Sequence, residues 1–81
     1  DYHYSLDASV AETLLHLPAR QRRVFIEAFR MLADNPNLEG DTTFLDPSGR
    51  TIQKVNLGRW RISCWTDHPI KEVRIVGIQK I

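Results

Sequence analysis

The stretch VNLGRWRISCW, residues 55 to 65, decides the fold that the sequence predicts. On both sides of Gly58 its residues alternate in polarity, which is typical of two strands joined by a tight turn. Glycine at the first of two turn positions favours a type II′ β-hairpin, and such a turn fixes which residues face each other. We therefore expect Leu57 to face Trp60 and Asn56 to face Arg61.

This pairing divides the hairpin into two sides, because successive side chains of a strand point to opposite faces of the sheet. One side is almost entirely apolar and is expected to pack on helices; it consists of Gln53, Val55, Leu57, Trp60, Ile62 and Cys64. The other side holds Ile52, Lys54, Asn56, Arg61, Ser63 and Trp65. From the last strand we expect Arg74 and Lys80 to join this second side, with Gly77 facing the helices.

The remaining sequence predicts two helices and two more strands. The expected helices cover about 9–17 and 19–34, and the expected strands cover 2–6, about 51–57, 60–66 and 72–78. Ser9 and Glu12 have the spacing of a capping box at the start of the first helix. Residues 37–50 are rich in Gly, Asp, Ser and Pro and predict a loop. These elements predict an α+β domain spanning residues 1–81.

Length and composition limit the classes of function. An 81-residue chain with 42% hydrophobic and 26% charged residues is typical of one small globular domain. No apolar run is long enough to span a membrane and no signal-peptide pattern opens the chain, so we expect a cytoplasmic protein. The single cysteine, Cys64, has no partner for a disulfide or a zinc site, and we expect neither a metal nor another cofactor.

Charge is distributed unevenly along the chain. Residues 1–49 hold four basic and eight acidic side chains, whereas residues 50–81 hold seven basic and two acidic ones. A concentration of positive charge suits a phosphate-rich or acidic partner. Lys and Arg that keep exposed strand edges soluble would give the same pattern.

In order along the chain, the motifs resemble those of the RelE/ParE superfamily of toxins from type II toxin–antitoxin systems. The resemblance is carried by Leu17-Pro18, by Leu32 to Pro36, by the hairpin Arg59-Trp60-Arg61-Ile62, and by a final strand VRIVGIQKI. It covers essentially the whole chain. The resemblance implies two helices packed on one face of a small, antiparallel-dominated sheet of about four strands, with the other face concave and open.

The resemblance also implies a function and the residues that carry it. Toxins similar to RelE cleave messenger RNA without a metal, often on the ribosome, and basic residues of the sheet activate the ribose 2′-hydroxyl and stabilise the phosphate. Matched position by position, Lys54 and Arg61 are the expected catalytic residues. The expected RNA- or antitoxin-binding residues are Asn56, Arg59, Trp65, Arg74, Gln79 and Lys80.

Two positions depart from the pattern of the nuclease toxins. Asn56 stands where a second basic residue is expected, and Gln79 stands about where a further arginine occurs. The 81 residues contain no counterpart of the C-terminal segment that carries a catalytic tyrosine or histidine in many relatives. A ParE-like gyrase inhibitor that is not an enzyme, and an attenuated toxin that acts as a binding module, are therefore alternatives to the nuclease.

The histidines and the partners complete the set of expectations. His16 is expected at a helix end and His68 in a strand connection, while His3 has no assignment. A cognate antitoxin is the partner implied under every alternative, and an acidic one would suit the basic face. Messenger RNA with the ribosome is the target implied for a nuclease, and DNA gyrase for a ParE-like protein.

Overall fold

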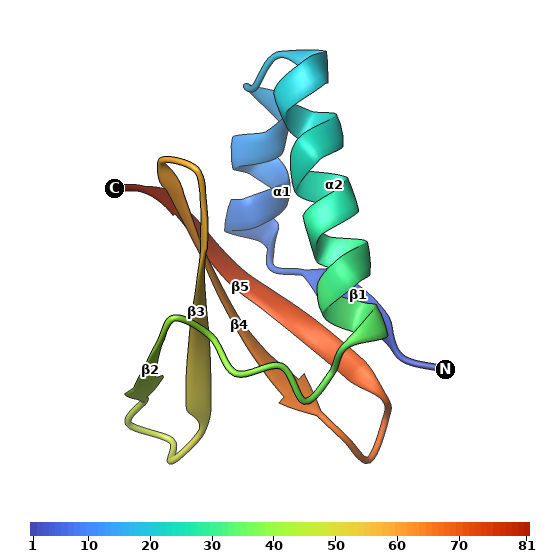
Figure 1. Ribbon diagram of the computed structural model, residues 1–81, viewed down its shortest axis with the longest axis vertical. Coiled ribbons are helices and arrows are strands. Elements are labelled where there is room, and N and C mark those ends of the chain that lie inside the picture. The colour runs from blue at the N-terminus through green and yellow to red at the C-terminus, as the bar shows by residue number, and fades with distance from the viewer.

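The computed structural model describes residues 1–81 and packs a helical hairpin on one face of a sheet (Figure 1). The elements in chain order are β1 (His3–Leu6), α1 (Ala8–Leu15), α2 (Ala19–Asp34), β2 (Thr42–Leu45), β3 (Thr51–Leu57), β4 (Trp60–Asp67) and β5 (Glu72–Lys80). The expected helices and strands are all present, and their ends agree with the expected ones within two residues.

The sheet is mixed and has five strands in the order β1-β5-β4-β3-β2. The expectation of about four strands is therefore wrong. β1 runs parallel to β5, and the three other pairs are antiparallel, so antiparallel pairing does dominate. The two helices carry the chain from β1 at one edge of the sheet to β2 at the other, so β1 has no hairpin connection to β5 that would require an antiparallel pair.

The extra strand, β2, lies inside the segment predicted to be a loop. It has four residues, all exposed, and therefore lacks the buried alternation by which strands are recognised. β2 pairs with β3, and its Phe44 lies opposite Ile52. Phe44 thus extends the face of the sheet that carries Ile52.

Only the first helix differs from its predicted bounds: it covers 8–15, whereas about 9–17 was expected. α1 begins at Ala8 with Asp7 as N-cap residue, and no side chain caps it. The predicted capping box is wrong, because Ser9 lies inside the helix, where its carbonyl accepts a hydrogen bond from the Thr13 hydroxyl at 2.9 Å. α2 covers the predicted 19–34, ending before the Asn35-Pro36 pair. Neither helix combines the length and apolar character needed to cross a membrane.

The core lies between the helices and the inner strands. It comprises Val10, Leu14, Phe25, Phe29, Leu32, Ile62, Cys64, Val73 and Ile75. Phe29 is completely buried, with its ring centroid 6.0 Å from that of Phe25 and 5.6 Å from that of Tyr4. The ring of Phe25 meets Trp60 edge-on at 5.3 Å, which ties α2 to the start of β4. The apolar side of the hairpin therefore does pack on the helices, as predicted.

The predicted hairpin register is confirmed. Leu57 pairs with Trp60, Asn56 with Arg61 and Lys54 with Ser63. Gly58 has a φ of 58°, and its neighbour in the turn has no positive φ, which is the backbone pattern of a type II′ turn.

A bulge in β5 changes the predicted faces of that strand. Ser63 pairs with Gly77, but the next residue, Cys64, pairs with Ile75, so Val76 is an additional residue on β5. Beyond the bulge the alternation is shifted by one. Gly77 consequently faces away from the helices together with Ser63, and Lys80 shares the helix-side face with Trp60. Both placements correct the sequence prediction.

The linker from α2 to β2 passes directly over β3. A Cβ atom added at Gly40 would lie 2.6 Å from the Lys54 carbonyl oxygen, so only glycine fits this approach. The Gly40 N–H donates to the Gln53 side chain at 2.7 Å, and the Asn56 N–H donates to the Asp41 carboxylate at 2.7 Å. These contacts fix the linker beside the middle of β3.

Candidate functional site

The face of the sheet that the helices leave uncovered holds most of the predicted functional residues; we call it the open face. Its central members are Lys54, Asn56, Arg61, Ser63, Trp65, Arg74 and Gln79. β3 supplies the first two, β4 the next three and β5 the last two. The alternation of the three strands and the bulge at Val76 together bring these side chains to one surface.

Lys54 and Arg61 form the basic end of the open face. Neither has a carboxylate within 4 Å, although the chain has four such ion pairs elsewhere. The Nε of Arg61 donates to the side-chain oxygen of Asn56 at 3.2 Å. The Lys54 ammonium group lies 5.3 Å from the centroid of the Phe44 ring, a cation–π distance. Both cations are therefore available to an anionic ligand.

Two further polar residues border this basic end. Gln79 lies opposite Arg61 on β5, and Asn56 lies opposite it on β3, so an uncharged amide flanks Arg61 on each side. Neither amide can take up or release a proton at neutral pH. Of the two basic residues and the two amides, only Lys54 therefore has a group that can exchange a proton with a substrate.

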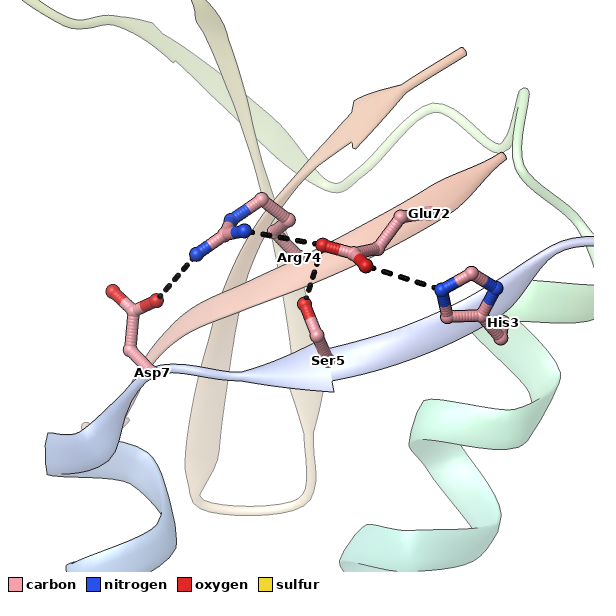
Figure 2. Close-up of polar contacts among 5 residues, drawn as sticks. All are labelled: His3, Ser5, Asp7, Glu72 and Arg74. Carbon is pink, nitrogen blue, oxygen red and sulfur yellow. Dashed lines mark hydrogen bonds and ion pairs between the residues drawn. The ribbon is translucent and has the colours of Figure 1, made fainter. Parts of the chain in front are cut away.

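Arg74 belongs to a separate cluster at the β1 side of the open face (Figure 2). Its guanidinium donates to Glu72 at 3.1 Å and lies 3.5 Å from Asp7. Glu72 also accepts hydrogen bonds from Ser5 at 2.9 Å and from His3 at 3.1 Å. The Ser5 hydroxyl, the His3 ring and the Arg74 charge together hold the pKa of Glu72 below its usual value, against the opposing effect of burial. Two carboxylates thus compensate the charge of Arg74.

Trp65 stands between these two clusters, opposite Arg74 on β5. The Arg50 guanidinium lies over its ring, 4.6 Å from the centroid. Arg50 is in turn held by the Ser48 hydroxyl at 2.8 Å and by the Asp46 carboxylate at 3.8 Å. Hydrogen bonds from the Ser48 side chain and from the Arg50 and Ser48 backbone lower the pKa of Asp46. The β2–β3 turn therefore holds a guanidinium group against the indole.

A groove of about 390 Å³ opens beside Trp65 on the open face. It is lined by Phe44, Asp46, Arg50, Ile52, Lys54, Ser63, Trp65, Val76 and Gly77. Sequence reasoning missed Phe44, Asp46 and Arg50. The position of Arg50 was recoverable, because it lies two residues before Ile52 and four before Lys54 and so shares their face. Phe44 was not recoverable without β2.

Two other predicted site residues, Arg59 and Lys80, lie away from the open face. Arg59 is in the exposed β3–β4 turn. Trp60 and Lys80 are on the helix-side face, and the Lys80 ammonium group lies 5.9 Å from the Trp60 ring centroid. All three line a second hollow, of about 410 Å³, between the hairpin and the start of α2. The fold therefore separates them from Lys54 and Arg61.

The histidines take no part in the basic end. His3 contacts Glu72, as described, and His68 in the β4–β5 connection accepts or donates a hydrogen bond at 2.7 Å with the Tyr2 hydroxyl. His16 is the C-cap residue of α1, at the predicted helix end. Nowhere do three or more His, Cys, Asp or Glu side chains gather in a way that could hold a metal ion.

Cys64 is buried on the helix side of the hairpin, 4% exposed, and burial raises the pKa of its thiol to about 11. The residue is part of the core cluster with Ile62 and Val73. A protonated thiol in such surroundings acts as a small apolar side chain.

Comparison with solved structures identifies the fold. The structure is similar to a chain of the archaeal RelE–RelB complex from Pyrococcus horikoshii OT3, with a TM-score of 0.75 over 98% of this chain and 93% of that chain, at 20% sequence identity. No protein-family model and no curated protein sequence matches the chain. The chain therefore has a RelE-like fold, as its motifs predicted.

Proposed function

We propose that the chain is the toxin of a type II toxin–antitoxin system and acts as a metal-independent endoribonuclease on messenger RNA. The observation that carries the proposal is the pair Lys54 and Arg61, two cations without carboxylate partners on the uncovered face of a RelE-like fold. An RNA backbone is the ligand such a pair suits, because each phosphate carries a negative charge and the cations need no prior ion pair to be broken.

In the proposed reaction the ribose 2′-hydroxyl oxygen attacks the adjacent phosphorus. A new bond forms between the 2′ oxygen and phosphorus, and the bond from phosphorus to the 5′ oxygen breaks. The upstream fragment ends in a 2′,3′-cyclic phosphate, and the downstream fragment begins with a 5′-hydroxyl. An ammonium group cannot accept a proton, so Lys54 first releases one to water; its neutral amine then accepts the proton of the 2′-hydroxyl and regains its positive charge beside the phosphate, while water supplies a proton to the departing 5′ oxygen. Arg61 stabilises the negative charge that gathers on the phosphate oxygens, which is the larger contribution in catalysis of this type.

Asn56 and Gln79 support a second candidate. Because both amides lie beside Arg61 and neither transfers protons, Lys54 is the one side chain around Arg61 that can exchange a proton with a substrate. Such a surface is also suited to a protein that binds its target without cleaving RNA, either a ParE-like gyrase inhibitor or an attenuated toxin. In that case Arg61 would act in binding alone.

A cognate antitoxin is the proposed protein partner. The similar archaeal structure is a complex of RelE with RelB, and the open face of this chain offers unpaired positive charge at Lys54 and Arg61. An acidic segment of the antitoxin would be attracted to this surface and would block access of RNA. Antitoxin and RNA thus compete for the same cations.

Expression of the chain without antitoxin tests the proposal and separates the alternatives. A nuclease arrests growth and leaves breaks at mappable positions in translated messages, and Arg61→Ala abolishes both effects. Arg23→Ala, which removes the same charge from the exposed side of α2, leaves both effects intact. Growth arrest with intact messages and damaged DNA would support gyrase as target, and no arrest under strong expression would support an attenuated binding module.

A further inference from the structure

We infer that the groove beside Trp65 is a subsite for one unpaired base of the RNA, next to the phosphate held by Lys54. The inference rests on the proposed function and specifies its substrate as single-stranded RNA with an unstacked base at the cleavage site. It concerns the groove residues Phe44, Ile52, Trp65 and Val76, which the basic pair does not include.

The groove has the apolar floor and aromatic walls that a base requires. Ile52 is buried and forms the floor with Val76, the additional residue of the β5 bulge, and with Gly77. Trp65 and Phe44 line the groove from β4 and β2, and Phe44 is 50% exposed. Proteins that bind single-stranded nucleic acid use such exposed rings, because every base has a π-face that stacks on them.

The Trp65 ring has a partner in the β2–β3 turn that limits its motion. Arg50 lies over the indole at 4.6 Å and is itself fixed by Ser48 and Asp46. The Arg50 guanidinium covers part of the indole, and a guanidinium plane itself stacks on bases, so both groups can contact a base in the groove. Little side-chain freedom would be lost when a base binds there.

The charges at the two ends of the groove determine where the phosphate and the base of the bound nucleotide lie. At one end Asp46 compensates the charge of Arg50, whereas at the other end Lys54 has no carboxylate within 4 Å. A phosphate is therefore attracted to the Lys54 end and repelled from Asp46. The base consequently lies toward Trp65 and Arg50, and its phosphate lies toward Lys54 and Arg61.

Binding of a 2′-O-methyl RNA hexamer tests the subsite, because this probe cannot be cleaved. The probe carries a fluorescent label, and anisotropy reports its Kd. Stacking on one aromatic side chain is lost in Trp65→Ala, so we expect Kd to rise about 5- to 100-fold. Phe44→Ala is also expected to weaken binding, and Phe44 is half exposed and lies outside the core cluster. Trp65→Phe restores most of the affinity.

Two controls make the result specific. Leu45→Ala removes the apolar neighbour of Phe44, which is 68% exposed and points to the opposite face of the sheet, and it leaves Kd unchanged. A hexamer that lacks the base at the stacked position should bind wild type as weakly as the intact hexamer binds Trp65→Ala. The abasic hexamer should bind Trp65→Ala no more weakly than either change alone, because both changes remove the same stacking contact.

The outcomes distinguish this inference from the proposed function. If Arg61→Ala weakens binding but Phe44→Ala and a folded Trp65→Ala do not, the base subsite is refuted and the RNA-binding face stands. If no variant changes Kd, or if the wild-type chain does not bind the hexamer, the base subsite is refuted, and the proposed nuclease is refuted as well if message also stays intact on programmed ribosomes. Additive losses from Trp65→Ala and every abasic position would also overturn the subsite.

Discussion

Arg61 donates a hydrogen bond from Nε to the side-chain oxygen of Asn56 at 3.2 Å, across the β3–β4 hairpin. The terminal nitrogens of Arg61 make no hydrogen bond to the protein, so they are free to bind a phosphate with two parallel hydrogen bonds. Asn56 therefore orients the guanidinium without neutralising its charge. In the proposed reaction Asn56 acts as a positioning residue.

Asn56→Lys places a basic residue at the position where the family resemblance implies one. Asn56→Lys and Asn56→Met both lose the hydrogen bond to Arg61, and we expect Asn56→Lys to cleave RNA about tenfold or more faster than Asn56→Met, because an amine beside Arg61 adds acid–base capacity. Initial rates on a defined RNA measure the effect. Asn56→Met is the matched control of similar length without charge, and equal rates for the two variants would refute a role for charge at this position.

Glu72 makes the stability of the β1–β5 pair dependent on pH. Its pKa in the folded chain lies below the usual 4.5, so its carboxylate stabilises the fold fully above about pH 4.5, and this contribution is lost as pH falls through the lowered value. We expect Glu72→Gln to be less stable than wild type at pH 7 and to lose less stability on acidification. Urea unfolding at several pH values measures both.

Asp67→Asn is the control for Glu72, because Asp67 lies opposite Glu72 on β4 and has no ion pair. This variant should show the same acid dependence as wild type. An equal change in both variants would mean that total charge, rather than the cluster of Ser5, His3 and Arg74, sets the dependence.

Gly40 is needed for the close approach of the linker to β3. Gly40→Ala places a Cβ atom 2.6 Å from the Lys54 carbonyl oxygen and 2.9 Å from its nitrogen, so the linker must move. We expect a loss of more than about 1 kcal/mol in the free energy of unfolding. In Gly77→Ala the added Cβ has its nearest neighbour at 3.8 Å, an ordinary contact, and stability should hardly change. Equal losses in urea unfolding would contradict this account.

The Cys64 thiol should be almost inert in the folded chain. A pKa raised from 9.0 to about 11 lowers the thiolate fraction at pH 8 about 100-fold, and burial also blocks access of a reagent. The rate of labelling by iodoacetamide, with and without denaturant, measures this protection. Equally fast labelling in both conditions would mean that the helix side of the hairpin is open.

Phe29 is the side chain on which the packing of α2 depends most. Because it is completely buried against Tyr4 and Phe25, Phe29→Ala should cost about 3–5 kcal/mol, a large part of the stability of a small domain. Met31→Ala on the same helix is 43% exposed and should change stability by no more than about 0.5 kcal/mol. A small effect at Phe29 would mean that the helices are only loosely attached.

The hairpin was predictable because its turn and its alternation agree. Gly58 fixes a two-residue turn, and that turn alone sets the facing pairs Asn56–Arg61 and Lys54–Ser63. α2 was predictable to the residue, because Pro18 and Pro36 bound an uninterrupted amphipathic pattern. Local rules were sufficient for these two elements, whose ends are marked by a glycine or by prolines.

The parts that sequence reasoning missed depend on contacts between distant segments. β2 is short and exposed and exists through its pairing with β3. The bulge at Val76 arises from the pairing of β5 with β4, and it reverses the faces of Gly77 and Lys80. The compensation of Arg74 requires Asp7, which lies far away in sequence. Periodicity within a segment carries no information on such pairings.

Cleavage of messenger RNA by the purified chain tests the central claim most directly. The measurement maps the ends of a defined message, free and on programmed ribosomes, after incubation with wild type, Arg61→Gln or Arg23→Gln. We predict discrete breaks with wild type and Arg23→Gln, and a loss of at least about 100-fold in rate with Arg61→Gln. Intact message under both conditions, or breaks that Arg61→Gln leaves unchanged, would contradict the account.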